Sequence, residues 1–276
     1  MIADKPQFNG KNIEFVVKDE PQQIQALLLK NDLDFAVLPT VMAVNLYNKG
    51  LKFRMAACPV WGTLYILTNE KTQDTLNISN KDIYVFGQGG TADILLQKYI
   101  EDYSFENVGI DYSYNSNQDL AQALLSSKIH YAIISEPMAS MLLSRNSNIR
   151  IVSKLHCEEY IFNKETDIFV QTAFVINDRF WKHNENTTKA ICEKYAESCS
   201  FANDYPQRTI NLLEKYGYVR PGSLSPSSIK RCNIKYFGAF GIEKELTEYL
   251  KLFYKFEPKS IGNKMPDSKF IYQQNS

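Results

Sequence analysis

The chain has 276 residues, of which 44% are hydrophobic and 22% are charged, and this profile excludes an intrinsically disordered protein. The length exceeds that of one average domain, so two compact lobes fit it best. Lysine plus arginine equals aspartate plus glutamate, at 31 each. This balance gives no electrostatic basis for binding nucleic acid, which requires an excess of clustered basic charge.

The first predicted elements are a helix, a strand and a second helix. Apolar residues at i, i+3 and i+4 from Ile24 onward predict the first helix. The continuous apolar run 34–38 is typical of a parallel strand that is covered on both faces. Pro39 ends this strand, and residues 41–48 predict the second helix.

The same order of elements returns 96 residues later in an internal repeat. Residues 117–153 align with residues 21–57 without gaps, and their apolar positions keep step. Identical pairs include Gln22 and Gln118, Leu28 and Leu124, Ala36 and Ala132, Met42 and Met138, and Arg54 and Arg150. Alternating helices and buried strands predict an α/β fold. Two copies predict two lobes, each with a mostly parallel sheet flanked by helices.

Two long strand patterns connect the copies. Residues 62–69 predict a strand that leads from the first lobe to the second, and residues 169–177 predict one that returns. Two such crossing strands would form a hinge. The helical patterns beyond residue 178 have no partner in the second lobe. We therefore predict that lobe 1 comprises residues 1–68 and 172–276, and that lobe 2 comprises residues 69–171.

The repeat also predicts that lobe 1 lacks its first strand. In lobe 2 the repeated part follows a strand at 83–86, a glycine-rich loop and a helix at 92–103. Lobe 1 opens with a segment that matches only the end of that helix. We expect the missing strand to lie between residues 13–17 and 35–38. We further expect the natural reading frame to begin upstream, with an export signal or a lipid anchor.

Candidate ligand-binding residues lie in loops that follow strands, where open α/β sheets bind ligands. The glycine-rich loop GQGGTA lets backbone N–H groups approach a ligand, and the following helix end favours an anion by about 0.3–1 kcal/mol. Each candidate also has a structural alternative: Thr40 as a helix cap, Trp61 as a core residue and Glu136 as a first-turn acid. The complete set is Pro39, Thr40, Trp61, Gly62, Gln88, Gly89, Gly90, Thr91 and Glu136.

Other chemistry finds little support in the sequence. The five cysteines include no CxxC motif, and the three histidines are scattered. His156-Cys157-Glu158-Glu159 is the one local cluster of metal-ligand types, and an ordinary surface segment is the preferred interpretation. GQGGTA does not fit the dinucleotide motif GxGxxG. We expect no metal, no cofactor and no catalytic residue.

Four runs together resemble one family. DLDFAVLPTVMAVNLYNKG, WGTLYILTNE, GQGGTADILLQKYIED and ISEPMA, in this order, resemble the nitrate, sulfonate, taurine and thiamine-pyrimidine group of periplasmic solute-binding proteins. The resemblance implies a type II periplasmic-binding fold whose cleft is lined by residues that include Thr40, Trp61, Gly89, Thr91 and Glu136. It further implies a monomeric component of an ABC importer that binds a small polar or anionic solute. Its partner would be a membrane permease, and it would be periplasmic or a lipid-anchored lipoprotein.

Two questions stay open at this point. Some proteins of this fold are enzymes of thiamine-pyrimidine or menaquinone-precursor synthesis, which gives an alternative function. The cysteine-dense motif and pocket histidine of the pyrimidine synthase have no counterpart in this sequence. The charge of the ligand is also open, because the glycine loop favours an anion whereas Glu136 and Trp61 favour an amine or a ring with N–H donors.

Overall fold

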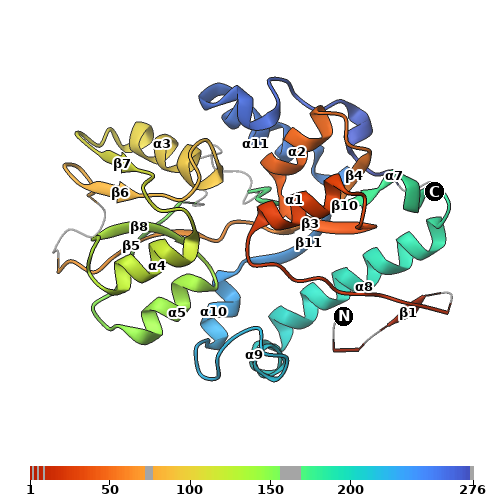
Figure 1. The fold of residues 1–276 in the computed structure, drawn as a ribbon, viewed down its shortest axis with the longest axis horizontal. Helices are drawn as coiled ribbons and strands as arrows, with labels where there is room; N and C mark the ends of the chain where they lie inside the picture. Colours follow the sequence, from red (N-terminus) through yellow and green to blue (C-terminus); the bar gives the residue numbers. More distant parts are fainter. Residues whose placement is uncertain (2, 5, 9, 72–76, 156–168, 274–276) are drawn as a thin grey trace. The chain divides into compact units, whose positions relative to one another are not determined.

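The computed structural model describes residues 1, 3–4, 6–8, 10–71, 77–155 and 169–273 (Figure 1). The chain divides into two compact units. Unit 1 comprises Met1–Trp61, Val170–Tyr205 and Ile234–Ser276, and unit 2 comprises Gly62–Phe169 and Pro206–Asn233. Each unit has a sheet with helices packed against it, so the expected α/β class is confirmed.

Unit 1 is built on a four-stranded sheet in the order β11-β4-β10-β3. The strands are β3 (Phe35–Pro39), β4 (Phe53–Val60), β10 (Thr172–Asn177) and β11 (Ile234–Gly238). Every pair in this sheet is antiparallel, which corrects the expectation of a mostly parallel sheet. The reason is that β10 lies between β3 and β4 and runs opposite to both.

The remaining elements of unit 1 pack around this sheet. Its apolar core includes Phe174, Ile176 and Ile191, with Phe35 packed against it. A short hairpin, β1 (Gln7–Phe8) and β2 (Lys11–Asn12), forms a separate two-stranded sheet. The helices are α1 (Pro21–Leu29), α2 (Thr40–Asn48), α7 (Asp178–Trp181), α8 (Glu185–Asp204) and α11 (Glu243–Phe256), with 3-10 turns η1 (Ala239–Ile242), η2 (Pro258–Ile261) and η3 (Ser268–Phe270).

Unit 2 has a five-stranded sheet in the order β7-β6-β8-β5-β9. The strands are β5 (Leu64–Thr68), β6 (Asp82–Tyr84), β7 (Gly109–Asp111), β8 (Tyr131–Ser135) and β9 (Arg150–Lys154). The helices are α3 (Thr91–Tyr103), α4 (Asn117–Leu125), α5 (Met138–Arg145), α9 (Pro206–Lys215) and α10 (Pro226–Arg231). β6 is parallel to β7 and β8, whereas β5 is antiparallel to β8 and β9.

The course of the chain differs from the expectation in two ways. β5 and β10 each pair within one unit, and the chain passes between units at four points, next to residues 61, 169, 205 and 233. The segment 206–233, expected in lobe 1, belongs to unit 2. Helical periodicity shows that a helix has an apolar face but does not show which sheet it covers.

The two copies of the repeat differ at one sheet position. β8 lies between β6 and β5, whereas β3 lies at the edge of its sheet with β10 as its neighbour. Val37 of β3 is therefore 39% exposed, and the aligned Ile133 of β8 is 2% exposed. Residues 13–17 form no strand. Among the described residues, no helix is both long and apolar enough to span a membrane.

Candidate functional site

The candidate residues lie in each unit at the end of the sheet where β3 and β4, or β6 and β8, finish, and parallel sheets commonly bind ligands at the corresponding end. In unit 1, Pro39 at the end of β3 pairs with Thr172 at the start of β10. In unit 2, Ser135 at the end of β8 pairs with Leu64 at the start of β5. We call these the ligand edges of unit 1 and unit 2.

Thr40 at the ligand edge of unit 1 carries an unpaired hydroxyl. It is the first residue of α2, whose N-cap is Pro39, so it does not serve as the cap. Its backbone N–H donates to the carbonyl of Gln171 at 3.0 Å. The Oγ1 atom is buried and has no partner among the described residues. A buried unpaired hydroxyl costs about 1–3 kcal/mol, so a ligand atom that bonds it would be favoured.

Trp61 belongs to the packed interior of unit 1. The side chain is 2% exposed, and its Nε1–H donates to the carbonyl of Lys235 at 2.5 Å. Its ring meets that of Phe237 edge-on at 4.9 Å. Because indole has one donor, that donor is already occupied. This geometry agrees with the core alternative. The following Gly62 has a φ of 120°, a conformation that residues with a Cβ rarely adopt.

The glycine loop of unit 2 closes on a buried carboxylate of its own. Asp93 in the first turn of α3 accepts a hydrogen bond from the backbone N–H of Gly89 at 2.6 Å and one from the Tyr112 hydroxyl at 2.8 Å. Burial, together with this hydrogen bond, raises the pKa of Tyr112 well above its usual range. A carboxylate at this place complements the helix dipole, so α3 already holds an anion.

The glycines themselves serve the turn. Gly87 and Gly89 have φ angles of 84° and 71°, and the N–H of Gly90 donates to the carbonyl of Gly87 at 3.0 Å. A Cβ on Gly90 would lie 2.9 Å from that carbonyl oxygen. The loop therefore has a structural need for glycine that is independent of any ligand. Its neighbours Gln88 and Thr91 are exposed and half-buried, respectively.

Glu136 at the ligand edge of unit 2 is engaged in a buried ion pair. Its carboxylate has no exposed side-chain surface and accepts from Arg231 Nε at 2.6 Å and from Ser140 Oγ at 2.8 Å. Arg231 Nη2 also donates to Ser140 Oγ at 2.6 Å. Glu136 is thus not free to receive an amine. Burial, with a smaller contribution from the charge of Glu136, raises the pKa of the Cys232 thiol to about 12.

Arg231 itself is only partly covered. Its side chain is 26% exposed, and its Nη1 group has no acceptor among the described residues. The Tyr65 hydroxyl donates to the Arg231 carbonyl at 3.1 Å, which fixes the end of α10 near the start of β5. Arg231 therefore presents an oriented cation beside Glu136, at the ligand edge of unit 2.

Comparison with known proteins identifies the family. The chain is similar to an ABC transporter from Parabacteroides distasonis of known structure, with 34% sequence identity and a TM-score of 0.87. The alignment covers 99% of this chain and 93% of that chain. The chain belongs to this ABC-transporter family.

More distant structures show the fold of this ABC-transporter family member. The periplasmic aliphatic sulphonate-binding protein SsuA from Escherichia coli is 13% identical, with a TM-score of 0.67 over 91% of this chain and 82% of that chain. A Candida albicans gene product with the generic periplasmic binding protein fold is 12% identical, with a TM-score of 0.61 over 95% and 88%. The expected resemblance to periplasmic binding proteins is confirmed. No family model matches the chain, and no curated protein matches it significantly.

Arg231 is the functional candidate of this ABC-transporter protein that sequence reasoning missed. Glu136 and Arg231 are 95 residues apart, so no local spacing links them. The available signal was the capping box of Ser225 and Ser228 that starts α10, which places Arg231 in the last turn of a short helix.

The part of this chain that the structure describes contains no metal centre. No group of three or more His, Cys, Asp or Glu side chains is placed there to hold a metal ion. The cluster His156-Cys157-Glu158-Glu159 lies outside the described residues.

Proposed function

We propose that this protein is the solute-binding component of an ABC importer and that it captures a small anionic solute without chemical conversion. Membership of an ABC-transporter family and the periplasmic binding protein fold support the binding role. The observation that carries the charge of the ligand is Arg231, held by Glu136 and Ser140 at the ligand edge of unit 2. A guanidinium fixed in this way suits the oxygens of a carboxylate or sulfonate.

The other ligand-binding residues of the proposal come from both units. Thr40 offers an unpaired hydroxyl in unit 1, and the glycine loop offers Gln88 and Thr91 in unit 2. The remaining proposed residues are Pro39, Trp61, Gly62, Gly89, Gly90 and Glu136, of which Glu136 acts by orienting Arg231. The proposal includes a monomeric protein outside the cytoplasmic membrane, free or lipid-anchored, and a membrane permease as partner.

A ligand screen by thermal unfolding tests this proposal. The panel comprises alkanesulfonates, nitrate, bicarbonate, pyrimidines and polyamines. An anion at 100 times its dissociation constant should stabilise the protein by about 2.7 kcal/mol, and polyamines should have no effect. Stabilisation by polyamines alone would contradict the proposed charge. Turnover of a candidate metabolite by the purified protein would instead support the enzyme of thiamine-pyrimidine or menaquinone-precursor synthesis.

Matched variants locate the site once an anion binds. Glu136→Gln keeps the cation of Arg231, so anion binding should persist or tighten. The double variant Glu136→Gln with Arg231→Gln removes both charges and should weaken binding by at least about tenfold, because a charge-assisted hydrogen bond contributes roughly 1.5–3 kcal/mol. Isothermal titration calorimetry measures both. If Glu136→Gln abolishes binding while the double variant binds normally, the anion is not bound by Arg231.

A further inference from the structure

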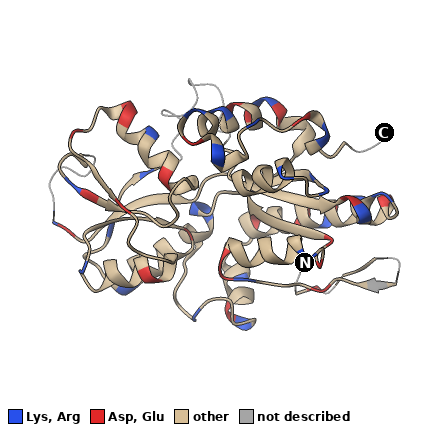
Figure 2. Cartoon of the chain, turned by 45° about the horizontal axis from the view of Figure 1, so that its top comes forward, with Lys and Arg blue, Asp and Glu red and all other residues tan. Residues whose placement is uncertain are grey.

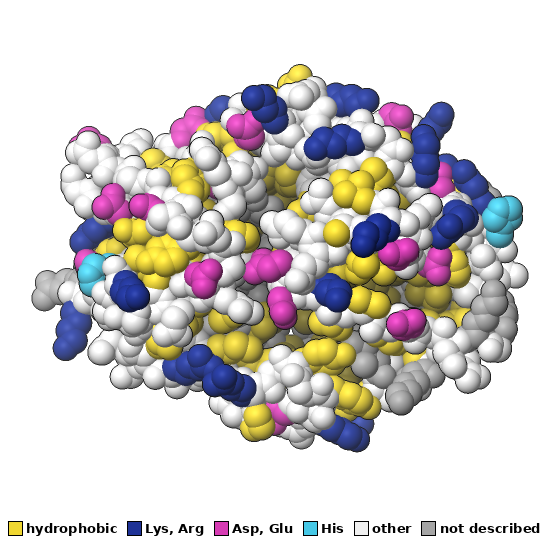
Figure 3. All heavy atoms as spheres, viewed as in Figure 1, with side chains coloured by type: hydrophobic (Ala, Val, Ile, Leu, Met, Phe, Trp, Pro, Cys, Tyr) yellow, Lys and Arg dark blue, Asp and Glu magenta, His cyan; other side chains and the backbone are white. Residues whose placement is uncertain are grey.

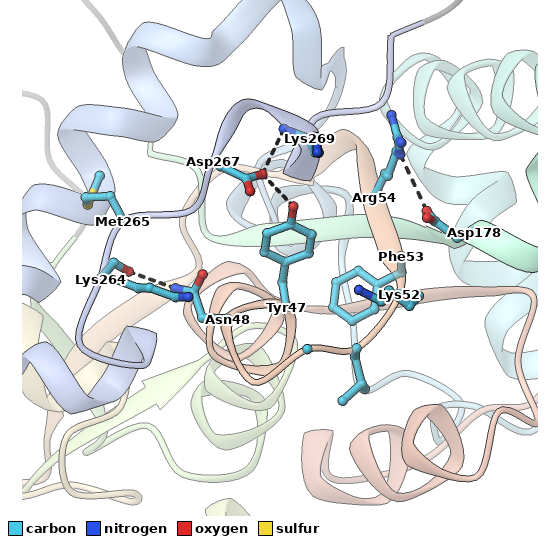
Figure 4. Close-up of a pocket in the computed structure, with 12 residues that line it drawn as sticks. Tyr47, Asn48, Lys52, Phe53, Arg54, Asp178, Lys264, Met265, Asp267 and Lys269 are labelled. Carbon is cyan, nitrogen blue, oxygen red and sulfur yellow. Dashed lines mark hydrogen bonds and ion pairs between the residues drawn. The ribbon is translucent and has the colours of Figure 1, made fainter.

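A cavity lies in unit 1 at the sheet end opposite its ligand edge (Figure 4). The cavity has a volume of about 350 Å³, within the range of small-molecule sites. Phe53 at the start of β4 pairs with Asn177 at the end of β10, and both lie away from Pro39 and Val60. The cavity wall comes from the end of α2, the segment that leads into β4, and the segment 264–269.

The acidic groups of this cavity are held by neighbouring donors. Asp267 accepts from the Tyr47 hydroxyl at 2.6 Å, and Figure 4 shows the hydroxyl directed at the carboxylate. Burial, with help from this bond, raises the pKa of Tyr47 to about 12, and the same bond lowers the pKa of Asp267. Asp178 accepts from Trp181 Nε1 and Lys182 Nζ at 3.1 Å each. Although burial alone raises it, these bonds lower the pKa of Asp178.

The cavity carries more positive than negative charge. Its lining holds four cations and two carboxylates, which leaves a net charge of +2. Arg54 Nε lies 3.4 Å from Asp178, and its guanidinium carbon lies 4.7 Å from the centre of the Trp181 ring. The other three cations, which form no ion pair among the described residues, are Lys52, Lys264 and Lys269. On the face in Figure 3, by contrast, acidic and basic side chains lie interspersed.

Buried aromatic rings pack against Tyr47 in the cavity wall. Phe53 and Phe270 are buried, and their ring centres lie 6.3 Å and 5.1 Å, respectively, from that of Tyr47. A low-dielectric wall strengthens the field of nearby charges. The cavity therefore combines a partly open hollow, a net positive charge and neighbouring buried aromatic rings.

We propose that this cavity binds a small multivalent phosphate. A net charge of +2, with lysines on two segments of the chain, suits a ligand that carries several negative charges on separate oxygens. The ligand need not be the imported solute, because Arg231 and Thr40 at the ligand edges take no part in the cavity. This site therefore stands apart from the proposed solute-binding function.

Calorimetric titration of the whole chain with inorganic pyrophosphate at low salt tests the proposal. We expect one bound pyrophosphate per chain. The variant Lys52→Gln, Lys264→Gln, Lys269→Gln should weaken binding about tenfold, equivalent to about 1.4 kcal/mol, because it removes three positive charges from the lining. Its control, Lys18→Gln, Lys189→Gln, Lys244→Gln, makes the same change of net charge at exposed positions of unit 1 outside the cavity.

The control variant decides between a site and general charge attraction. Full binding by the control and weakened binding by the cavity variant would support the site. Equal weakening in both variants, or absence of any binding heat, would overturn it. Both variants change exposed side chains, so their melting temperatures without ligand should match that of the parent chain closely.

Discussion

At the residue scale, the Glu136–Arg231 pair has the most deeply buried carboxylate among the ion pairs in the described part of unit 2. The carboxylate is wholly buried, whereas the guanidinium keeps 26% of its side chain exposed. Taking a charge out of water is costly, and a paired guanidinium offsets that cost only while both partners are present. The contribution of each residue to stability therefore depends on the presence of the other.

Removing one partner should lower the free energy of unfolding more than removing both. Arg231→Gln leaves Glu136 buried without its cation and should lower the free energy of unfolding by about 3–5 kcal/mol. The double variant Glu136→Gln with Arg231→Gln should lose clearly less, because no buried charge remains. Urea unfolding of the three proteins measures the difference. Equal losses in the single and double variants would show that the pair is not coupled.

At the element scale, β3 and β8 offer a matched test of sheet position. They occupy aligned places in the repeat, yet Val37 is 39% exposed on the edge strand and Ile133 is 2% exposed on the inner strand. An inner strand is covered along both of its edges, so its side chains contribute more to packing. The expectation that unit 1 has a further strand beside β3 stays a prediction.

Introducing threonine at the two positions should therefore lower the stability by different amounts. Ile133→Thr buries a hydroxyl and removes apolar volume, so it should lower the free energy of unfolding by about 2–4 kcal/mol. Val37→Thr should change it by less than about 0.5 kcal/mol. Thermal or urea unfolding gives both values. A large loss in Val37→Thr would mean that this face of β3 is covered in solution.

Much of the element order could be predicted from local patterns, but the pairing of the strands could not. The apolar run before Pro39 and its repeat before Glu136 are β3 and β8. Their neighbours could not be predicted, because a continuous apolar run is typical of any strand that is covered on both faces. The insertion of β10 between β3 and β4 is a pairing of residues more than a hundred positions apart.

The candidate site also has a part that the sequence could predict and a part that it could not. The loops after β3, β6 and β8 were predictable, because each shows a break after a strand. The roles of Glu136 and the glycine loop could not be predicted, because they depend on Arg231 and Tyr112, which lie elsewhere in the sequence. The sequence around Trp61 likewise gives no sign that its indole N–H is already hydrogen-bonded within the protein.

At the scale of the whole molecule, both units are assembled from separate stretches of chain. Acidic and basic residues are interspersed along the helices of both (Figure 2). Unit 2 needs residues 206–233, which are synthesised after 170–205 of unit 1. Folding of unit 2 thus waits for a distant segment, and such long-range closure slows folding.

A fragment experiment tests whether unit 2 is a folding unit with these boundaries. Residues 62–169 alone lack α10, so Glu136 loses Arg231, and Tyr65 loses the carbonyl that its hydroxyl bonds. The fragment also lacks Ile229, which is 3% exposed in α10. Joining 62–169 to 206–233 through a flexible glycine-serine linker of about 15 residues restores these contacts without unit 1.

The linked fragment should unfold cooperatively in urea, whereas 62–169 alone should show a broad transition or none, because it lacks an ion pair and an apolar helix face. Circular dichroism and amide hydrogen exchange measure both. The linked fragment carrying Arg231→Gln serves as the control and should fall between the two. If 62–169 alone unfolds as sharply as the linked fragment, residues 206–233 are accessory to unit 2, and Arg231 is held less firmly than its contacts require.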